Sequence, residues 1–187
     1  MVEQQVMKIT SLKIEGTYLI ELNPIIDSRG YFVRTYEKQL FEANNLATNW
    51  LQENQSLSKQ IHTIRGMHFQ KPPYSETKLI SVIEGKILDV FIDLRKNSAT
   101  YGKWDSVELS ESNNLCVYIP KGFAHGFCTL TDITRVCYKV DSNYHPESEG
   151  ILSWNDSSLG IDWPTSNPFI SDKDNIGADF KSFVSPF

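Results

Sequence analysis

Apolar and polar residues alternate along most of this chain in short runs, the spacing expected of β-strands. Turn sequences such as Asp27-Ser28-Arg29-Gly30 separate the runs, and the only helical spacing lies at 37–45. The predicted strands are 8–22, 31–36, 50–58, 63–70, 78–83, 86–94, 104–109, 115–119, 128–130 and 134–140.

The turns between these runs predict particular strand pairs. Glu84-Gly85 has the length of a two-residue hairpin loop, so strands 78–83 and 86–94 are predicted to pair. The runs at 128–130 and 134–140 are likewise predicted to pair across Thr131-Asp132. Many short strands with one short helix indicate a mainly β fold, a sandwich or a barrel.

The 187 residues are expected to form one domain, since the chain is long enough for a full core and no linker or repeat interrupts it. Residues 1–7 are expected to be flexible. From 141 to 187 the alternation is lost, and this loop-rich segment is predicted to pack over the barrel.

The run Thr63-Ile64-Arg65-Gly66-Met67-His68-Phe69-Gln70 carries the first candidate chemistry. Side chains repeat every second residue in a strand, so Met67 and Phe69 share one face and His68 and Gln70 the other. A polar face on an inner strand makes a poor core and suggests a site. The alternative is a histidine satisfied within the core or at the surface.

A second polar face is predicted on the strand at 50–58, where Gln52, Asn54, Ser56 and Ser58 alternate with other residues. Such a face is usually exposed to solvent, but it can also line a wet pocket. The sequence alone leaves both readings open.

Charge and composition exclude several classes of protein. The net charge is −5 and no Lys/Arg cluster occurs, which argues against nucleic acid as a partner. No apolar run approaches the ~20 residues of a membrane span, and the N-terminus does not have the pattern of a signal peptide. Three cysteines, Cys116, Cys128 and Cys137, are expected to be reduced core thiols, as in a cytoplasmic protein.

The run His68-Phe69-Gln70 followed by Pro120-x-Gly122-x-x-His125 resembles the paired motifs of the cupin superfamily, small jelly-roll β-barrels. Metal-binding cupins carry His-x-His at the first motif, whereas here Gln70 replaces the second histidine. His68, Glu76 and His125 would be the remaining ligands of such a site. No metal is expected.

A more specific resemblance is to the dTDP-4-dehydrorhamnose 3,5-epimerase family, metal-free cupins of deoxysugar biosynthesis. The matching segments, in family order, are Asp27-x-Arg29-Gly30-x-Phe32, Gln52-x-Asn54-x-Ser56, Arg65 to Gln70, Lys78-Leu79, Asp89-Val90-x-x-Asp93-Leu94-Arg95, Ile119 to Phe127, Tyr138-Lys139, Trp154-Asn155-Asp156 and Ser171-x-Lys173-Asp174. The resemblance implies a dTDP-linked 4-keto sugar as substrate, no cofactor, and a homodimer that exchanges residues near the N-terminus.

The resemblance also implies roles for individual residues. Inversion next to a ketone needs a base, a cation or donor at the developing oxyanion, and an acid on the opposite face. His68 would be the base, oriented by Asp174, with Lys78 at the oxyanion and Tyr138 as the acid. Substrate binding would involve Arg29 and Arg65 at the diphosphate and Phe32 at the base of the nucleotide. It would also involve Gln52, Asn54, His125 and Tyr144. Asp89 would hold the pocket together with His125.

The chain departs from the family pattern at two places. Family members often carry a pair of tyrosines a few residues after the catalytic one, but here only Tyr144 occurs, and the loop 74–77 is atypical. Three alternatives therefore stay open: an epimerase that inverts C3 or C5 only, a 3,4-ketoisomerase acting on a related dTDP sugar, and a non-catalytic nucleotide-sugar-binding cupin.

Overall fold

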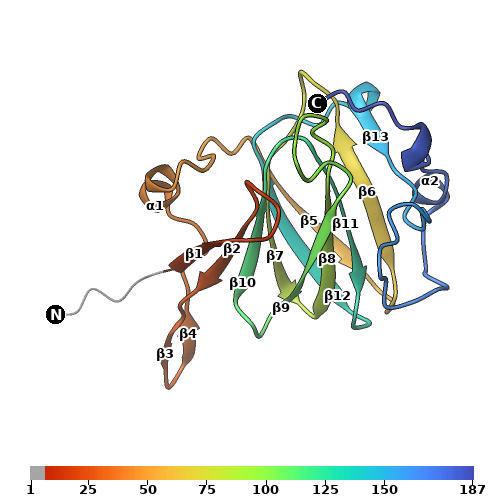
Figure 1. Cartoon of the computed structure of the whole chain (residues 1–187). Coiled ribbons are helices and arrows are strands. Elements are labelled where there is room, and N and C mark those ends of the chain that lie inside the picture. Colours follow the sequence, from red (N-terminus) through yellow and green to blue (C-terminus); the bar gives the residue numbers. More distant parts are fainter. Residues whose placement is uncertain (1–6) are drawn as a thin grey trace.

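Two antiparallel β-sheets face each other in the computed structural model, which describes residues 7–187 (Figure 1). The six-stranded sheet has the order β1-β2-β10-β7-β12-β5, and the five-stranded sheet β13-β6-β11-β8-β9. The strands of the six-stranded sheet are β1 (Met7–Ser11), β2 (Tyr18–Leu22), β5 (Gln52–Ser58), β7 (Lys78–Glu84), β10 (Leu115–Ile119) and β12 (Thr134–Val140). Those of the five-stranded sheet are β6 (Ile64–Gln70), β8 (Lys86–Asp93), β9 (Trp104–Ser110), β11 (Phe123–Thr129) and β13 (Glu149–Ile151).

From β5 to β13 the chain crosses from one sheet to the other at almost every connection; only β8 and β9 are consecutive neighbours in one sheet. The two predicted hairpins are therefore wrong. β7 pairs with β10 and β12 rather than with β8, and β12 pairs with β5 and β7 rather than with β11. Alternation of apolar and polar residues shows that one face of a strand is buried. The same alternation results whether the next strand of the chain pairs with it in the same sheet or lies in the facing sheet. The mainly β, jelly-roll prediction itself is confirmed.

The core has three layers of apolar contact. The first fills the space between the sheets, with Ile80 of β7 and Phe91 of β8 facing it from opposite sides. The second lies between the five-stranded sheet and the C-terminal segment, and the third between the six-stranded sheet and α1 (Lys38–Ala43), around Phe41. Both sheets are thus covered on their outer faces over part of their area.

The C-terminal segment follows the outer face of the five-stranded sheet, beside β6 (Figure 1). It contains two short 3₁₀ helices, η1 (Pro146–Ser148) and η2 (Phe180–Ser182), and one short α-helix, α2 (Asp172–Asn175). Leu152 and Leu159 are buried there against Met67 and Phe69. This packing brings α2 next to β6.

The N-terminal part departs from the expected single strand at 8–22. It forms β1 and β2, which pair with each other and are joined by a loop. Residues 1–6 of the predicted flexible terminus lie outside the described residues, whereas Met7 is only 1% exposed at the start of β1. Next come the short strands β3 (Ile25–Asp27) and β4 (Gly30–Phe32), a hairpin that projects away from the barrel (Figure 1).

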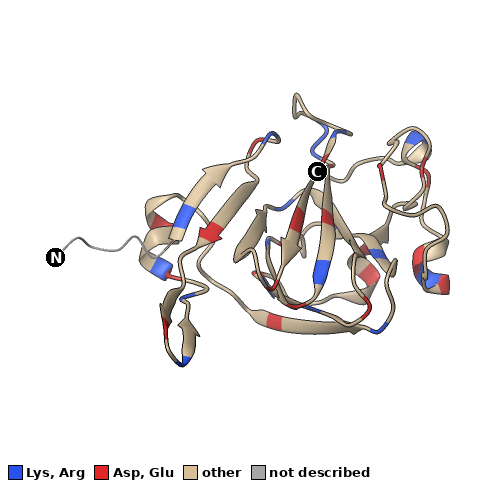
Figure 2. Cartoon of the chain, turned by 90° about the horizontal axis from the view of Figure 1, so that it is seen from below, with Lys and Arg blue, Asp and Glu red and all other residues tan. Residues whose placement is uncertain are grey.

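Charged residues of both signs are interspersed along the described ribbon (Figure 2). None of the helices between residues 7 and 187 combines the length and apolar character needed to cross a bilayer.

Candidate active site

Two adjoining cavities open between the sheets. The outer cavity measures about 510 Å³ and the inner one about 290 Å³. Four residues line both cavities: His68, Lys78, Tyr138 and Lys173. Further polar residues line only one cavity. The outer cavity is lined by Gln52, Asn54, Gln70, Glu76, Tyr144 and Glu149, and the inner cavity by Ser56, Arg65, His125 and Asp174, among others.

His68 reaches the cavities because of the alternation along β6. Met67 and Phe69 turn outward to the C-terminal segment, so His68 and Gln70 turn inward, as predicted. Gly66 is required just before them: its φ is +138°, and a Cβ there would lie 2.5 Å from the Cα of Gly126 on β11. Only a glycine lets β6 and β11 approach so closely.

Asp174 is the hydrogen-bond partner of His68. One carboxylate oxygen, Oδ1, lies 2.9 Å from His68 Nε2, and the other accepts from the backbone N–H of Gly66 at 3.2 Å. Burial alone would raise the pKa of this carboxyl, but the hydrogen bonds from His68, Gly66 and Ser171 outweigh it and hold the pKa below its usual value. The ionised carboxylate accepts a hydrogen bond from the Nε2–H group of His68, which leaves the imidazole lone pair on Nδ1.

A second His–Asp pair stands directly beside the first. His125 on β11 is the register partner of His68 on β6, and its Nε2 lies 2.7 Å from Asp89 Oδ2. Asp89 is fully buried; burial raises the pKa of its carboxyl, and the His125 imidazole partly offsets this. The His125 side chain is 12% exposed and borders the inner cavity.

Tyr138 and Lys78 approach from the opposite sheet. Both lie on the six-stranded sheet, on neighbouring strands, whereas His68 lies on the five-stranded sheet. Burial raises the pKa of the Tyr138 phenol, and the negative charge of Glu76 raises it further. Tyr138 therefore keeps its proton at neutral pH and lies across the cavity from His68.

Carboxylates compensate most of the cations in the cavities. Lys78 pairs with Glu76 at 2.5 Å, and Lys173 pairs with Glu149 at 2.6 Å. Arg65 is different: it donates to Ser58 Oγ and the Leu57 carbonyl, and it makes no ion pair within residues 7–187. Its guanidinium is thus the charge best suited to an anionic ligand.

The polar face of β5 lines the cavities and not open solvent, which decides between the two readings of its alternation. Gln52 and Asn54 line the outer cavity, and the buried Ser56 hydroxyl, which faces the inner one, has no hydrogen-bond partner among the described residues. Tyr144 is half exposed at the mouth of the outer cavity, where its hydroxyl lies 3.2 Å from Glu149.

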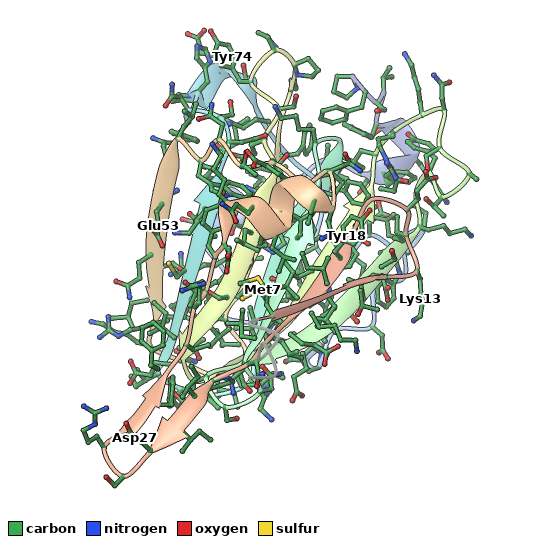
Figure 3. All side chains as sticks on the ribbon, turned by 90° about the vertical axis from the view of Figure 1, so that its left-hand side faces the viewer. Met7, Lys13, Tyr18, Asp27, Glu53 and Tyr74 are labelled. Atoms are coloured by element: carbon green, nitrogen blue, oxygen red, sulfur yellow. The ribbon has the colours of Figure 1, made fainter. Side chains whose placement is uncertain are left out.

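Two predicted binding residues lie elsewhere in this chain. Arg29 sits at the tip of the β3–β4 hairpin, 87% exposed and paired with Asp27, and Phe32 is 65% exposed on β4. Figure 3 places Asp27, at this tip, at the opposite end of the molecule from Tyr74 in the loop before β7. Neither Arg29 nor Phe32 lines either of the two cavities.

The three residues considered for a metal site are engaged in other contacts. His68 and His125 bind Asp174 and Asp89, and Glu76 binds Lys78. In the described part of the chain, no group of three or more His, Cys, Asp or Glu side chains is arranged to hold a metal ion.

Sequence reasoning gave no catalytic or substrate-binding role to Gln70, Glu76, Glu149, Lys173 or Ser56, although all five border the cavities. For Glu76 a signal was present. It precedes Lys78 by two residues at the start of a strand, so the two side chains share a face. Glu149 and Lys173 lie in the irregular C-terminal segment, where no periodicity indicates which way a side chain points.

Comparison with known proteins identifies the family to which this chain belongs. The family model for dTDP-4-dehydrorhamnose 3,5-epimerase matches residues 11–182. The chain belongs to this epimerase family. A dTDP-4-dehydrorhamnose 3,5-epimerase from Methanothermobacter thermautotrophicus is 43% identical over 164 residues, 86% of this chain and 88% of the relative. The resemblance noted in the sequence is thereby confirmed.

Two further members of the epimerase family are also similar to this chain. The crystal structure of the 3,5-epimerase from Bacillus anthracis, with TDP and PPi bound, superposes with a TM-score of 0.90 at 43% identity, covering 92% of this chain and 99% of that one. A dTDP-4-dehydrorhamnose 3-epimerase from Streptomyces niveus is 35% identical over 169 residues, 90% of this chain and 81% of the relative. The family thus includes enzymes named for two centres and for one.

Proposed function

We propose that this protein is an isomerase that inverts C3 and C5 of dTDP-4-dehydro-6-deoxy-D-glucose to give dTDP-4-dehydro-L-rhamnose. The observation that carries the proposal is the placement of His68 and Tyr138 on facing sheets. Inversion requires proton removal from one face of a carbon and proton return to the other face, and the two groups stand on the two walls of one cavity.

The reaction needs only acid, base and charge stabilisation. His68 Nδ1 removes the proton α to the ketone, and the C–H electron pair moves into the C3–C4 or C4–C5 bond as O4 becomes an enolate oxygen. Asp174 stabilises the imidazolium, and the Lys78 ammonium stabilises O4. Tyr138 then donates its proton to the opposite face of the carbon, and the carbonyl reforms. No electrons are lost or gained, so the step requires no redox cofactor.

Substrate binding is assigned to polar groups on the cavity walls. Arg65 takes the diphosphate, because it is a cation with no carboxylate partner in the described chain. Gln52, Asn54 and Tyr144 contact the nucleotide or sugar in the outer cavity. His125, held by Asp89, contacts the sugar in the inner cavity.

We infer a homodimer in which Arg29 and Phe32 of one subunit reach the pocket of the other, because neither residue lines the two cavities of its own chain. Four large side chains of the β3–β4 hairpin are more than half exposed, an apolar surface typical of an interface; they are Ile25, Ile26, Tyr31 and Phe32. Light scattering after size exclusion is expected to give a dimer, which Phe32→Asp weakens. Ile176→Asp, at an even more exposed position elsewhere, should leave the dimer unchanged. A wild-type monomer at micromolar concentration would contradict the inference.

A cytoplasmic location is inferred from the thiols. Cys116, Cys128 and Cys137 are all free, and burial raises the pKa of Cys116 to about 12 and of Cys128 to about 11. Thiols of this kind fit a reducing compartment such as the cytoplasm.

Product analysis tests the proposed reaction. Purified protein is incubated with dTDP-4-dehydro-6-deoxy-D-glucose, and proton coupling constants give the configuration at each carbon of the product. Inversion at both C3 and C5 is expected. Inversion at one centre would assign the chain to the single-centre alternative, a movement of the ketone to C3 would assign it to the ketoisomerases, and an unchanged sugar would leave only binding.

A further inference from the structure

The Lys78–Glu76 pair is one of two Lys–Glu pairs in the outer cavity, and the reaction as derived above gives Glu76 no role. Both side chains are almost enclosed, with 11% of Lys78 and 12% of Glu76 exposed. A buried ion pair is not a reliable source of stability, because desolvation offsets the attraction. The effect of this carboxylate on the position of Lys78 is therefore of more interest than its contribution to stability.

A lysine side chain has a flexible four-carbon stem, so its ammonium occupies one place only if something holds it. Glu76 Oε1 lies 2.5 Å from Lys78 Nζ, and that nitrogen also stands 5.8 Å from the centroid of the Tyr138 ring. The carboxylate uses one of the three ammonium hydrogens. The other two remain for the substrate oxygen.

Glu76 is itself anchored to the strand that carries the base. Its second oxygen, Oε2, accepts from Gln70 Nε2 at 3.2 Å, and Gln70 lies two residues after His68 on the same face of β6. Gln70 is 3% exposed. The series His68, Gln70, Glu76, Lys78 thus connects β6 of one sheet to β7 of the other.

The anchor also fastens the rim of the outer cavity. The Gln70 amide nitrogen lies within hydrogen-bond distance of the carbonyls of Tyr74 and Asn143, at 3.0 and 3.2 Å, and its oxygen accepts from the backbone N–H of His145 at 2.6 Å. The rings of Tyr74 and His145 stack with centroids 3.9 Å apart. Two loops far apart in the sequence are held together by this one buried amide.

We propose that Glu76, held by Gln70, is a positioning residue that fixes the Lys78 ammonium at the developing O4 oxyanion. This inference rests on the proposed function, in which Lys78 stabilises the enolate. A carboxylate acting in this way affects the transition state more than substrate binding, because the oxyanion charge exists only after the proton has left. Loss of the Glu76 carboxylate should therefore lower kcat and leave KM almost unchanged.

The first test is Glu76→Gln, which keeps the shape and an acceptor for Gln70 but removes the charge. We expect kcat to fall about 10- to 100-fold, as for loss of a charge-assisted hydrogen bond, with KM changed less than about threefold. Glu76→Asp keeps the charge on a side chain that is one methylene shorter, so its kcat should lie between those of wild type and Glu76→Gln. The matched control is Glu53→Gln on β5 (labelled in Figure 3), and its kcat should be unchanged. Glu53 pairs with Lys139 of β12, and neither residue lines the two cavities.

The double variant decides whether Glu76 acts through Lys78. In a Lys78→Ala background, Glu76→Gln should cause no further loss, because the group it positions is gone. An equal loss in both backgrounds, or a Glu76→Gln kcat within twofold of wild type, would overturn the inference while leaving the proposed function intact. Absence of turnover in the unmodified protein would overturn the proposed function and this inference with it.

Discussion

The pairing of His68 with Asp174 leads to the sharpest prediction, for the substitution Asp174→Asn. The asparagine keeps the size of the side chain and can still accept from the Gly66 N–H, but it carries no charge to stabilise an imidazolium. The substitution therefore removes a charge-assisted hydrogen bond of 2.9 Å to His68 Nε2. Such bonds contribute about 1.5–3 kcal/mol.

At 1.36 kcal/mol per factor of ten, this loss corresponds to a fall in kcat of about 10- to 160-fold. KM should change little, because the imidazolium forms only after substrate has bound. Initial rates at pH 7 with saturating dTDP-4-dehydro-6-deoxy-D-glucose measure the effect. Asp172→Asn is the matched control: it makes the same change two residues away on α2, at an exposed carboxylate outside both cavities.

A kcat for Asp174→Asn within twofold of wild type would refute the reasoning, since His68 would then work without its carboxylate. Equal losses in Asp174→Asn and Asp172→Asn would also refute it. In that case the position of α2, and not the charge at Asp174, would be what matters.

Three further predictions concern other residues of the site and its response to acid. Tyr138→Phe should lower net inversion about 100-fold or more while His68 continues to exchange the α-proton; equal losses of exchange and inversion, measured by NMR, would exclude Tyr138 as the opposite-face acid. Arg65→Ala should weaken TDP binding about 10-fold or more in calorimetry and leave kcat within threefold; unchanged TDP affinity would remove Arg65 from the diphosphate site. The pKa of Asp174 is lower in the folded protein than its value of about 3.9 in the unfolded chain, so ionisation of this carboxyl stabilises the fold at higher pH. This contribution to stability is lost as the pH falls through the pKa of the folded protein. The stability difference between wild type and Asp174→Asn in urea unfolding should therefore shrink below about pH 4; a difference that grows there would contradict the assignment.

Local periodicity was sufficient to predict the inward face of β6. His68 and Gln70 alternate with Met67 and Phe69, and an alternating strand has only two faces. The same information cannot identify the neighbouring strand, which is why the predicted pairing across Glu84-Gly85 was wrong. Both strands that flank this turn bury alternate residues in one core, but they do so from opposite sheets.

The partners of the inward residues could not be read from any pattern. Asp174 lies 106 positions from His68 in a segment without periodicity, and only the resemblance to the epimerase family indicated it. Arg29 and Phe32 show the reverse case. Their motif was recognised in the sequence, but the hairpin that carries them projects away from the barrel (Figure 1), and no local pattern in residues 27–32 indicates that projection.

The proposed reaction requires His68 to remove α-protons from a 4-keto sugar. Proton NMR of dTDP-4-dehydro-6-deoxy-D-glucose with the protein in D₂O tests it most directly, with His68→Ala beside wild type. We predict that wild type introduces deuterium at both C3 and C5 and that His68→Ala introduces it at neither. Deuterium entering the sugar at the wild-type rate in His68→Ala would contradict this requirement.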